Sequence, residues 1–217
     1  MAVSTKRIAK NTTFLYLRMI LVMLVSLYTV RLTLSVLGVE DYGIYSAVGG
    51  VVAALSSLSA VLSGASQRFY SIELGNEKSA RIHIIFYTMI KVYLLVLLFI
   101  LLVGGSVGLW FVCNYLNLPL ERANVAYVIY ITSLFAFLSG LMASPFQGLI
   151  IAKEDMGIYA YVSIIEVFLK LSLVALLNYI EYDKLILYGV LLMLSQMIVS
   201  LIYVSITFCK YKEIRVR

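Results

Sequence analysis

The segment FLYLRMILVMLVSLYTVRLTLSVL (residues 14–37) decides the class of fold. It stays mainly apolar for longer than the roughly 20 residues that a helix needs to cross the hydrocarbon core of a bilayer. A secretory signal peptide would be shorter, would lack the internal arginines and would end in a cleavage site of small residues. We therefore predict a retained first membrane helix, preceded by the basic residues Lys6, Arg7 and Lys10.

The composition of the whole chain supports a membrane protein. Of the 217 residues, 63% are hydrophobic and 13% are charged, and the mean hydropathy is +1.01. A soluble domain is about half apolar and about a quarter charged, so lipid must be the main solvent of this chain. The net charge of +6 does not indicate nucleic-acid binding, because the basic residues are not gathered on one polar segment.

Six apolar segments are long enough to span a bilayer. They run approximately over residues 12–37, 43–66, 82–113, 123–151, 157–179 and 184–209. The connections are short and no alternating strand pattern is present, which argues against a membrane barrel. The sequence thus predicts an all-α polytopic integral membrane protein in which residues 1–217 form a single six-helix unit.

Lysine and arginine predict the orientation, because cytoplasmic loops of membrane proteins carry an excess of both. With the N-terminus in the cytoplasm, the inner segments hold Lys6, Arg7, Lys10, Arg68, Lys78, Arg81, Lys153, Lys210, Lys212, Arg215 and Arg217. The outer loops then hold only Arg122 and Lys184. We therefore predict that both termini are cytoplasmic.

Two of the predicted helices have unusual sequences. The stretch GGVVAALSSLSAVLSGAS (49–66) is dense in small residues, which indicates either tight helix packing or a helix that lines a cavity with hydrated serines. The stretch LMASPFQG (141–148) contains Pro145, which removes a backbone hydrogen bond and should bend its helix. This bend is either static or a hinge that opens one side of a cavity.

Four basic residues fall inside the predicted spans, and a charge at the centre of a bilayer is costly unless it faces protein or water. Arg18, Arg31 and Lys91 lie close enough to helix ends for their side chains either to reach the interface or to face a cavity. Lys170 and the single acid Glu166 lie farther in, about 20 and 14 Å along the fifth helix.

Glu166 and Lys170 are four residues apart with the acid first, so they share one helix face in the favourable order. One interpretation is a mutual ion pair that faces the interior of the bundle. The other is a pair that lines a polar cavity and either holds a charged substrate or relays a cation. Both interpretations require an interior that is not lipid.

Catalytic and metal-binding patterns are not found in the sequence, and we expect neither enzymatic activity, nor a metal, nor a cofactor. His83 stands alone, and the chain has no P-loop, zinc-protease motif or nucleophile elbow. Cys113 and Cys209 fall near opposite ends of the predicted helices, which excludes a disulfide between them.

Three segments resemble bacterial polysaccharide flippases of the Wzx type, which belong to the multidrug/oligosaccharidyl-lipid/polysaccharide exporter superfamily. They are LGVEDYGIYS (37–46), ASQRFYSIELG (65–75) and YAYVSIIEVFLKL (159–171). Each motif is short, but their order and spacing within six helices strengthen the resemblance, which runs over most of the chain.

The resemblance implies a multi-pass transporter of the bacterial cytoplasmic (inner) membrane. Such proteins move a polyprenyl-pyrophosphate-linked oligosaccharide to the outer leaflet for O-antigen, lipopolysaccharide or capsule synthesis at the cell envelope. Two six-helix lobes surround a cationic cavity. In this chain, the resemblance assigns binding of the anionic substrate to Arg18, Arg31, Lys91 and Lys170. It makes Glu166 the candidate for H⁺ or Na⁺ coupling.

One departure from the family pattern is large, because the chain corresponds only to the N-terminal lobe. The second lobe is missing from the sequence, and one lobe cannot enclose a central cavity. We expect either a fragment whose C-terminal lobe is elsewhere, a truncated gene product, or half of a dimer with a second copy.

Two other functions remain open. A cation-coupled multidrug exporter of the same superfamily would depend on acidic residues, whereas the spans hold one acid against four basic residues. A non-transporting membrane scaffold or remnant would keep its function when Glu166 and Lys170 are both neutralised.

Overall fold

The computed structural model describes residues 2–75, 81–116, 122–180 and 182–214, with side chains from Thr12 onward. These residues form a helical bundle without strands. The elements are α1 (Ala2–Ala54), α2 (Ser56–Leu74), α3 (Ile82–Val103), the π-helix η1 (Gly104–Gly108), α4 (Leu109–Tyr115), α5 (Ala123–Ala152), α6 (Met156–Leu177), α7 (Lys184–Lys210) and the short 3₁₀ turn η3 (Lys212–Ile214). The prediction of an all-α fold is confirmed.

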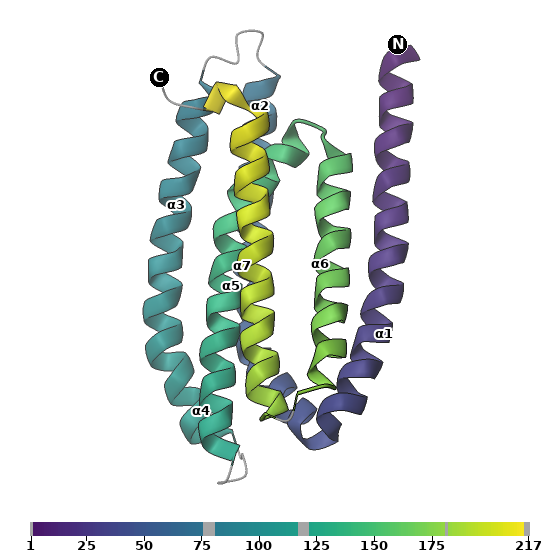
Figure 1. Cartoon of the computed structure of the whole chain (residues 1–217). Coiled ribbons are helices and arrows are strands. Elements are labelled where there is room, and N and C mark those ends of the chain that lie inside the picture. The colour runs from purple at the N-terminus through teal and green to yellow at the C-terminus, as the bar shows by residue number, and fades with distance from the viewer. Residues whose placement is uncertain (1, 76–80, 117–121, 181, 215–217) are drawn as a thin grey trace.

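Five helical stretches are long and apolar enough to cross a membrane. They are Thr12–Ala54, Ile82–Tyr115, Ala123–Ala152, Met156–Leu177 and Lys184–Lys210. The helices run alternately up and down the bundle, so both ends of the described chain lie at the same end (Figure 1). These features confirm the prediction of a multi-pass membrane protein.

The first stretch contains a chain reversal at Gly38. Its backbone has a φ of 82° and a ψ of 171°, while the residues on either side are helical. This left-handed φ is open to glycine and disfavoured by a side chain. The reversal joins the two helices expected at 12–37 and 43–66, at the bottom of Figure 1. The helix before it begins at Ala2 rather than near residue 12, and α2 continues to Leu74.

The second helical stretch, Ile82–Tyr115, contains a π-helical segment where a tyrosine from α5 enters. The Oη atom of Tyr130 in α5 donates a hydrogen bond to the carbonyl oxygen of Gly104 at 2.7 Å. A Cβ atom added at Gly108 would lie only 3.0 Å from Cζ of Tyr130 and closer still to its hydroxyl oxygen. The glycines of η1 therefore make room for the ring between α3 and α5.

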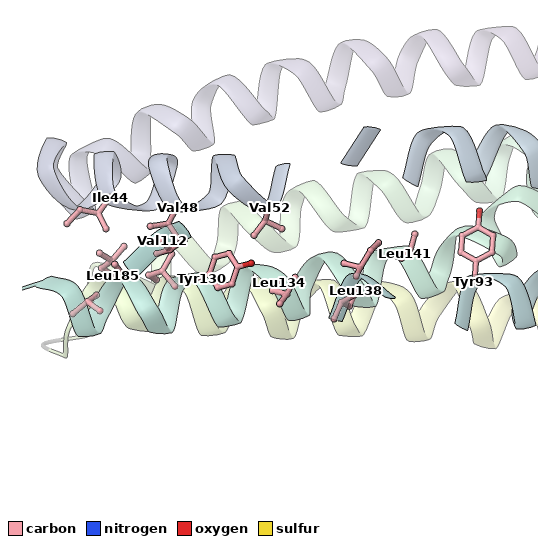
Figure 2. Packing of buried hydrophobic residues seen from close by; sticks show 14 residues of the cluster. Ile44, Val48, Val52, Tyr93, Val112, Tyr130, Leu134, Leu138, Leu141 and Leu185 are labelled. Atoms are coloured by element: carbon pink, nitrogen blue, oxygen red, sulfur yellow. The ribbon is translucent and has the colours of Figure 1, made fainter. Parts of the chain in front are cut away.

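Helix α5 forms the centre of the bundle, and apolar clusters surround both of its halves. One cluster joins Ile44 and Val48 of α1 with Val112 of α4, Tyr130 of α5 and Leu185 of α7 (Figure 2). The other cluster packs aromatic rings of four helices together and contains Tyr70, Phe86, Phe146 and Tyr203. By contrast, many apolar side chains of α1 and α3 are exposed, as expected for surfaces in contact with lipid.

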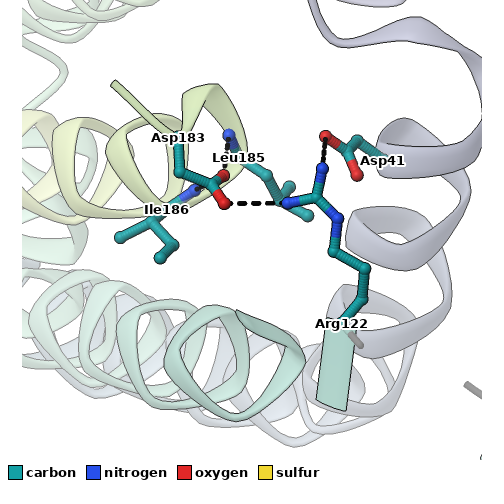
Figure 3. Close-up of polar contacts among 5 residues, drawn as sticks. All are labelled: Asp41, Arg122, Asp183, Leu185 and Ile186. Carbon is teal, nitrogen blue, oxygen red and sulfur yellow. Dashed lines mark hydrogen bonds and ion pairs between the residues drawn. The ribbon is translucent and has the colours of Figure 1, made fainter. Parts of the chain in front are cut away.

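An arginine connects three elements at the Gly38 end of the bundle (Figure 3). The Arg122 guanidinium lies 2.8 Å from the Asp183 carboxylate and 3.4 Å from that of Asp41. Asp183 also accepts hydrogen bonds from the backbone amides of Leu185 and Ile186, and so caps the start of α7. Arg122 thereby holds the Gly38 reversal together with the starts of α5 and α7.

At the opposite end of the bundle, the turn between α5 and α6 contacts the end of α7 and η3. Asp155 in this turn pairs with Lys210 at 3.0 Å and accepts a hydrogen bond from the hydroxyl of Tyr211. Lys153 pairs with Glu213 and lies over the Tyr211 ring. Burial, together with the Asp155 carboxylate, raises the pKa of Tyr211, so this hydroxyl stays protonated and remains a donor.

The close fit at η1 predicts that Gly108→Ala destabilises the bundle by about 1 to 3 kcal/mol, because a Cβ atom there displaces the buried, hydrogen-bonded Tyr130. Gly105→Ala is the matched control, since a Cβ atom there meets nothing within 4 Å. Equilibrium unfolding in detergent measures both. Equal stability of the two variants would show that Tyr130 moves aside at no cost.

The two roles of Asp183 can be separated by substitution. Asp183→Ala removes both the helix cap and the ion pair, and we expect it to lower the free energy of unfolding by about 1 to 2 kcal/mol. Asp183→Asn keeps an acceptor for the cap and loses only the charge, so its cost should stay below about 1 kcal/mol, since half-exposed pairs contribute little. If the two variants lose equal stability in the same unfolding experiment, the ion pair rather than the cap holds this end.

Candidate functional site

Glu166 and Lys170 form an ion pair within α6. Lys170 Nζ lies 2.6 Å from Glu166 Oε1, as the spacing of four residues allows. The side chains remain 25% exposed for Glu166 and 34% exposed for Lys170. Their remaining exposed surface faces the cavities described next, so the pair is accessible to molecules that enter them.

The first cavity lies between α1 and α6 and has a volume of about 360 Å³. It is lined by Arg18, Ser26 and Thr29 from α1, and by Ser163, Glu166 and Lys170 from α6. Charged and hydroxyl side chains therefore meet here beside three valines. Glu166 and Lys170 share one face of α6, and in the folded bundle Arg18 lines the same cavity.

Arg18 is held against α6 by a tyrosine. One of its terminal nitrogens donates a hydrogen bond to the Tyr159 hydroxyl at 3.2 Å, and the guanidinium carbon lies 4.3 Å from the centre of the Tyr159 ring. Its Nε atom is buried and has no hydrogen-bond partner among the described residues. Arg18 thus faces the bundle and keeps unused hydrogen-bonding capacity there.

Lys170 also lines two further cavities, of about 220 and 460 Å³. Tyr45 lines both, Tyr188 the smaller, and Thr132 and Ser133 the larger. Because one side chain borders three adjacent cavities, Lys170 lies where α1, α5, α6 and α7 meet.

A fourth cavity, of about 460 Å³, extends the hollow toward α2. Its polar lining consists of Ser56, Ser59, Ser63, Ser144, Gln147 and Gln196. Gln196 and Ala136 also line the 220 Å³ cavity, so the two are neighbours. We call the four cavities together the polar groove.

Only part of the small-residue stretch 49–66 lines this groove. A Cβ atom added at Gly49, Gly50 or Gly64 would meet nothing within 4 Å. Ser56, Ser59 and Ser63 line the fourth cavity. The cavity interpretation is therefore supported for this part, whereas Ser66 is buried against α3, as tight packing predicts.

The structure does not bring all predicted site residues together. Arg31 follows Arg18 by enough residues to turn about 220° around the helix, and its side chain is exposed on another face. Lys91 is exposed on α3. Neither residue lines any of the four cavities, and contact of either with a substrate stays a prediction.

Pro145 is buried in α5, and the helix continues through it without interruption. A role for Pro145 as a hinge stays a prediction. His83 takes no part in the groove. Cys113 and Cys209 are free, and the described residues contain no group of three or more side chains that suits a metal ion.

Sequence reasoning missed several polar residues of the groove. From the sequence, Tyr159 is expected only at the membrane interface and within a motif, and neither Gln147 nor Gln196 is predicted as a site residue. An amide side chain inside a long apolar run is a signal of a polar interior, since it is costly in lipid. That signal was present in the sequence at both glutamines.

Comparison of the chain with protein-family models, with curated proteins and with solved structures finds no match. The function must therefore be argued from the groove itself. Its charged part carries Arg18, Lys170 and Glu166, a net excess of one positive charge. A net positive site of this kind favours anions over cations.

A hydrated groove predicts reactivity of cysteines placed in it. In a Cys113→Ala/Cys209→Ala background, Gln196→Cys should react with a small charged methanethiosulfonate reagent, because the reactive thiolate forms in water. Leu95→Cys is the control, since Leu95 is 70% exposed on α3 but faces the predicted lipid. Mass spectrometry of protein in vesicles measures both, and equal protection of the two cysteines would show that the groove is dry.

Proposed function

We propose that this chain is one lobe of a flippase that moves a polyprenyl-pyrophosphate-linked oligosaccharide to the outer leaflet of the bacterial cytoplasmic membrane. The observation that carries the proposal is the position of Lys170, which borders three cavities within a bundle of membrane-spanning helices. The resemblance to Wzx-type flippases supports the same conclusion.

The charges of the groove favour an anionic substrate. Arg18 and Lys170 supply two cationic groups and Glu166 supplies one carboxylate, so a pyrophosphate meets attraction along the groove. Arginine and lysine both bind phosphate oxygens, arginine through several donors at once. Because the pair is partly buried, this attraction is stronger than between fully exposed charges.

Glu166 gives the site a means of coupling substrate transport to the binding of H⁺ or Na⁺. While it is ionised, it holds Lys170 at 2.6 Å. Protonation of Glu166, or capture of its carboxylate by Na⁺, frees the Lys170 ammonium group for the pyrophosphate. Transport driven by H⁺ or Na⁺ follows from this competition, and Arg31 and Lys91 are proposed to attract the substrate before it enters.

The same proposal includes the orientation of the chain in the membrane and the partner that completes the transporter. Both termini are cytoplasmic, in agreement with the lysine and arginine distribution. A C-terminal lobe or a second copy of the chain closes the groove on its open side, because a single lobe leaves it accessible. Access to the groove then alternates between the two faces of the membrane, with Pro145 as the candidate hinge.

Flipping is tested in a strain that lacks the whole gene. We expect completed lipid-linked repeat units to accumulate on the cytoplasmic side, and periodate or lectin accessibility in oriented vesicles measures the leaflet that holds them. Complementation with the gene should restore outward delivery. Normal delivery in a strain with no redundant flippase would contradict the proposal and would favour drug export or a scaffold.

Charge exchange tests the pair directly. Glu166→Lys and Lys170→Glu should each reduce delivery more than tenfold, because each leaves two like charges in a partly buried site. The double exchange should recover part of it. Lys184→Glu, the same change outside the groove, should have little effect. If the double exchange restores nothing in the leaflet assay, the role of the two residues is not simple pairing.

A further inference from the structure

Two glutamine side chains in the groove have no hydrogen-bond partner among the described residues. Gln147 of α5 and Gln196 of α7 line the 460 Å³ cavity beside α2, and both are half-buried. Ser200 donates a hydrogen bond to the backbone carbonyl of Gln196 and not to its side-chain amide. Gln67, in contrast, donates its amide to Ser63.

An amide without a partner is costly in the hydrocarbon region of a membrane. Gln196 lies near the middle of α7, far from either end of the helix. Its amide must therefore bond to water or to a ligand in the cavity. Gly140 leaves space for this amide, because a Cβ atom at that position would lie only 3.3 Å from Gln196 Nε2.

The lining of this cavity carries no charge, and its polar groups are serine hydroxyls and glutamine amides beside apolar residues such as Phe137 and Leu141. Each amide offers two N–H donors and a carbonyl acceptor, and each serine hydroxyl can both donate and accept. Such a set matches neighbouring hydroxyl groups, which also donate and accept. A bare anion, which only accepts, would use the donors and leave the amide carbonyl oxygens without partners.

The uncharged cavity directly adjoins the charged one. Gln196 and Lys170 both line the 220 Å³ cavity between them. A ligand whose anionic group is held at Lys170 would place the group attached to it against Gln196. The groove is thus divided into a cationic part and a hydroxyl-binding part, in series.

We infer that the cavity at Gln147 and Gln196 is a subsite for the uncharged, hydroxyl-bearing sugar attached to the pyrophosphate. This inference rests on the proposed function, because it assumes that the anion is bound at Lys170. Substrate recognition then has two components, with the anion held by charge and the sugar held by amide and hydroxyl hydrogen bonds.

Binding of two lipids to the purified chain in nanodiscs tests the subsite. The probes are farnesyl pyrophosphate and the same lipid with N-acetylglucosamine attached, and calorimetry measures both affinities. We expect Gln147→Met/Gln196→Met to weaken binding of the sugar-bearing lipid about tenfold, through the loss of two hydrogen-bonding groups, and to leave farnesyl pyrophosphate unaffected. Gln67→Met is the matched control, because that amide is bonded to Ser63 and does not line the cavity.

The outcomes separate the subsite from the proposed function. If the double variant binds both lipids as the unchanged chain does, the sugar subsite is wrong and the anion site stands. If the unchanged chain binds neither lipid, the proposed function fails together with the inference. The glutamine-to-methionine changes keep side-chain volume, and retained helical circular dichroism confirms folding; the single variants replace the double variant if it does not fold.

Discussion

The constraint on which this structure depends is the lack of water in the hydrocarbon core of a membrane. A polar side chain there has no solvent to bond, so it must find a partner inside the protein or a hydrated hollow. Hydroxyl groups solve this locally, as Thr33 and Ser163 do by donating to the carbonyl oxygens of Thr29 and Tyr159 one turn earlier. Several charged and amide groups, among them Arg18, Lys170 and Gln196, line the groove instead.

The same constraint determines how the helices pack around α5. Lipid solvates apolar side chains as well as a protein core does, so contact with lipid alone provides no reason for helices to pack. The helices associate through shape, as where Tyr130 fits against Gly104 and Gly108, and through polar contacts at their ends. Arg122 at one end and Asp155 at the other join segments that are far apart in the sequence.

The parts that follow from hydropathy and from spacing along one helix could be predicted from the sequence. Membrane helices need a fixed apolar length, so the stretches near 123–151 and 184–209 lie close to the observed α5 and α7. The Glu166 and Lys170 contact follows from a separation of four residues. The groove itself could not be derived, because it depends on which faces of five different segments meet. For the same reason, no single-helix pattern distinguishes Arg18, which faces the groove, from Arg31, which does not.

The reversal at Gly38 has a consequence for the direction in which each later helix runs. A straight helix over the whole of Ala2–Ala54 would be about 80 Å long, more than twice the thickness of the hydrocarbon core. The chain returns into the bilayer because one residue takes a conformation that a side chain disfavours. Every later helix inherits its direction from that return. Residue 38 therefore fixes whether each later helix runs parallel or antiparallel to the first, whichever way the bundle is inserted.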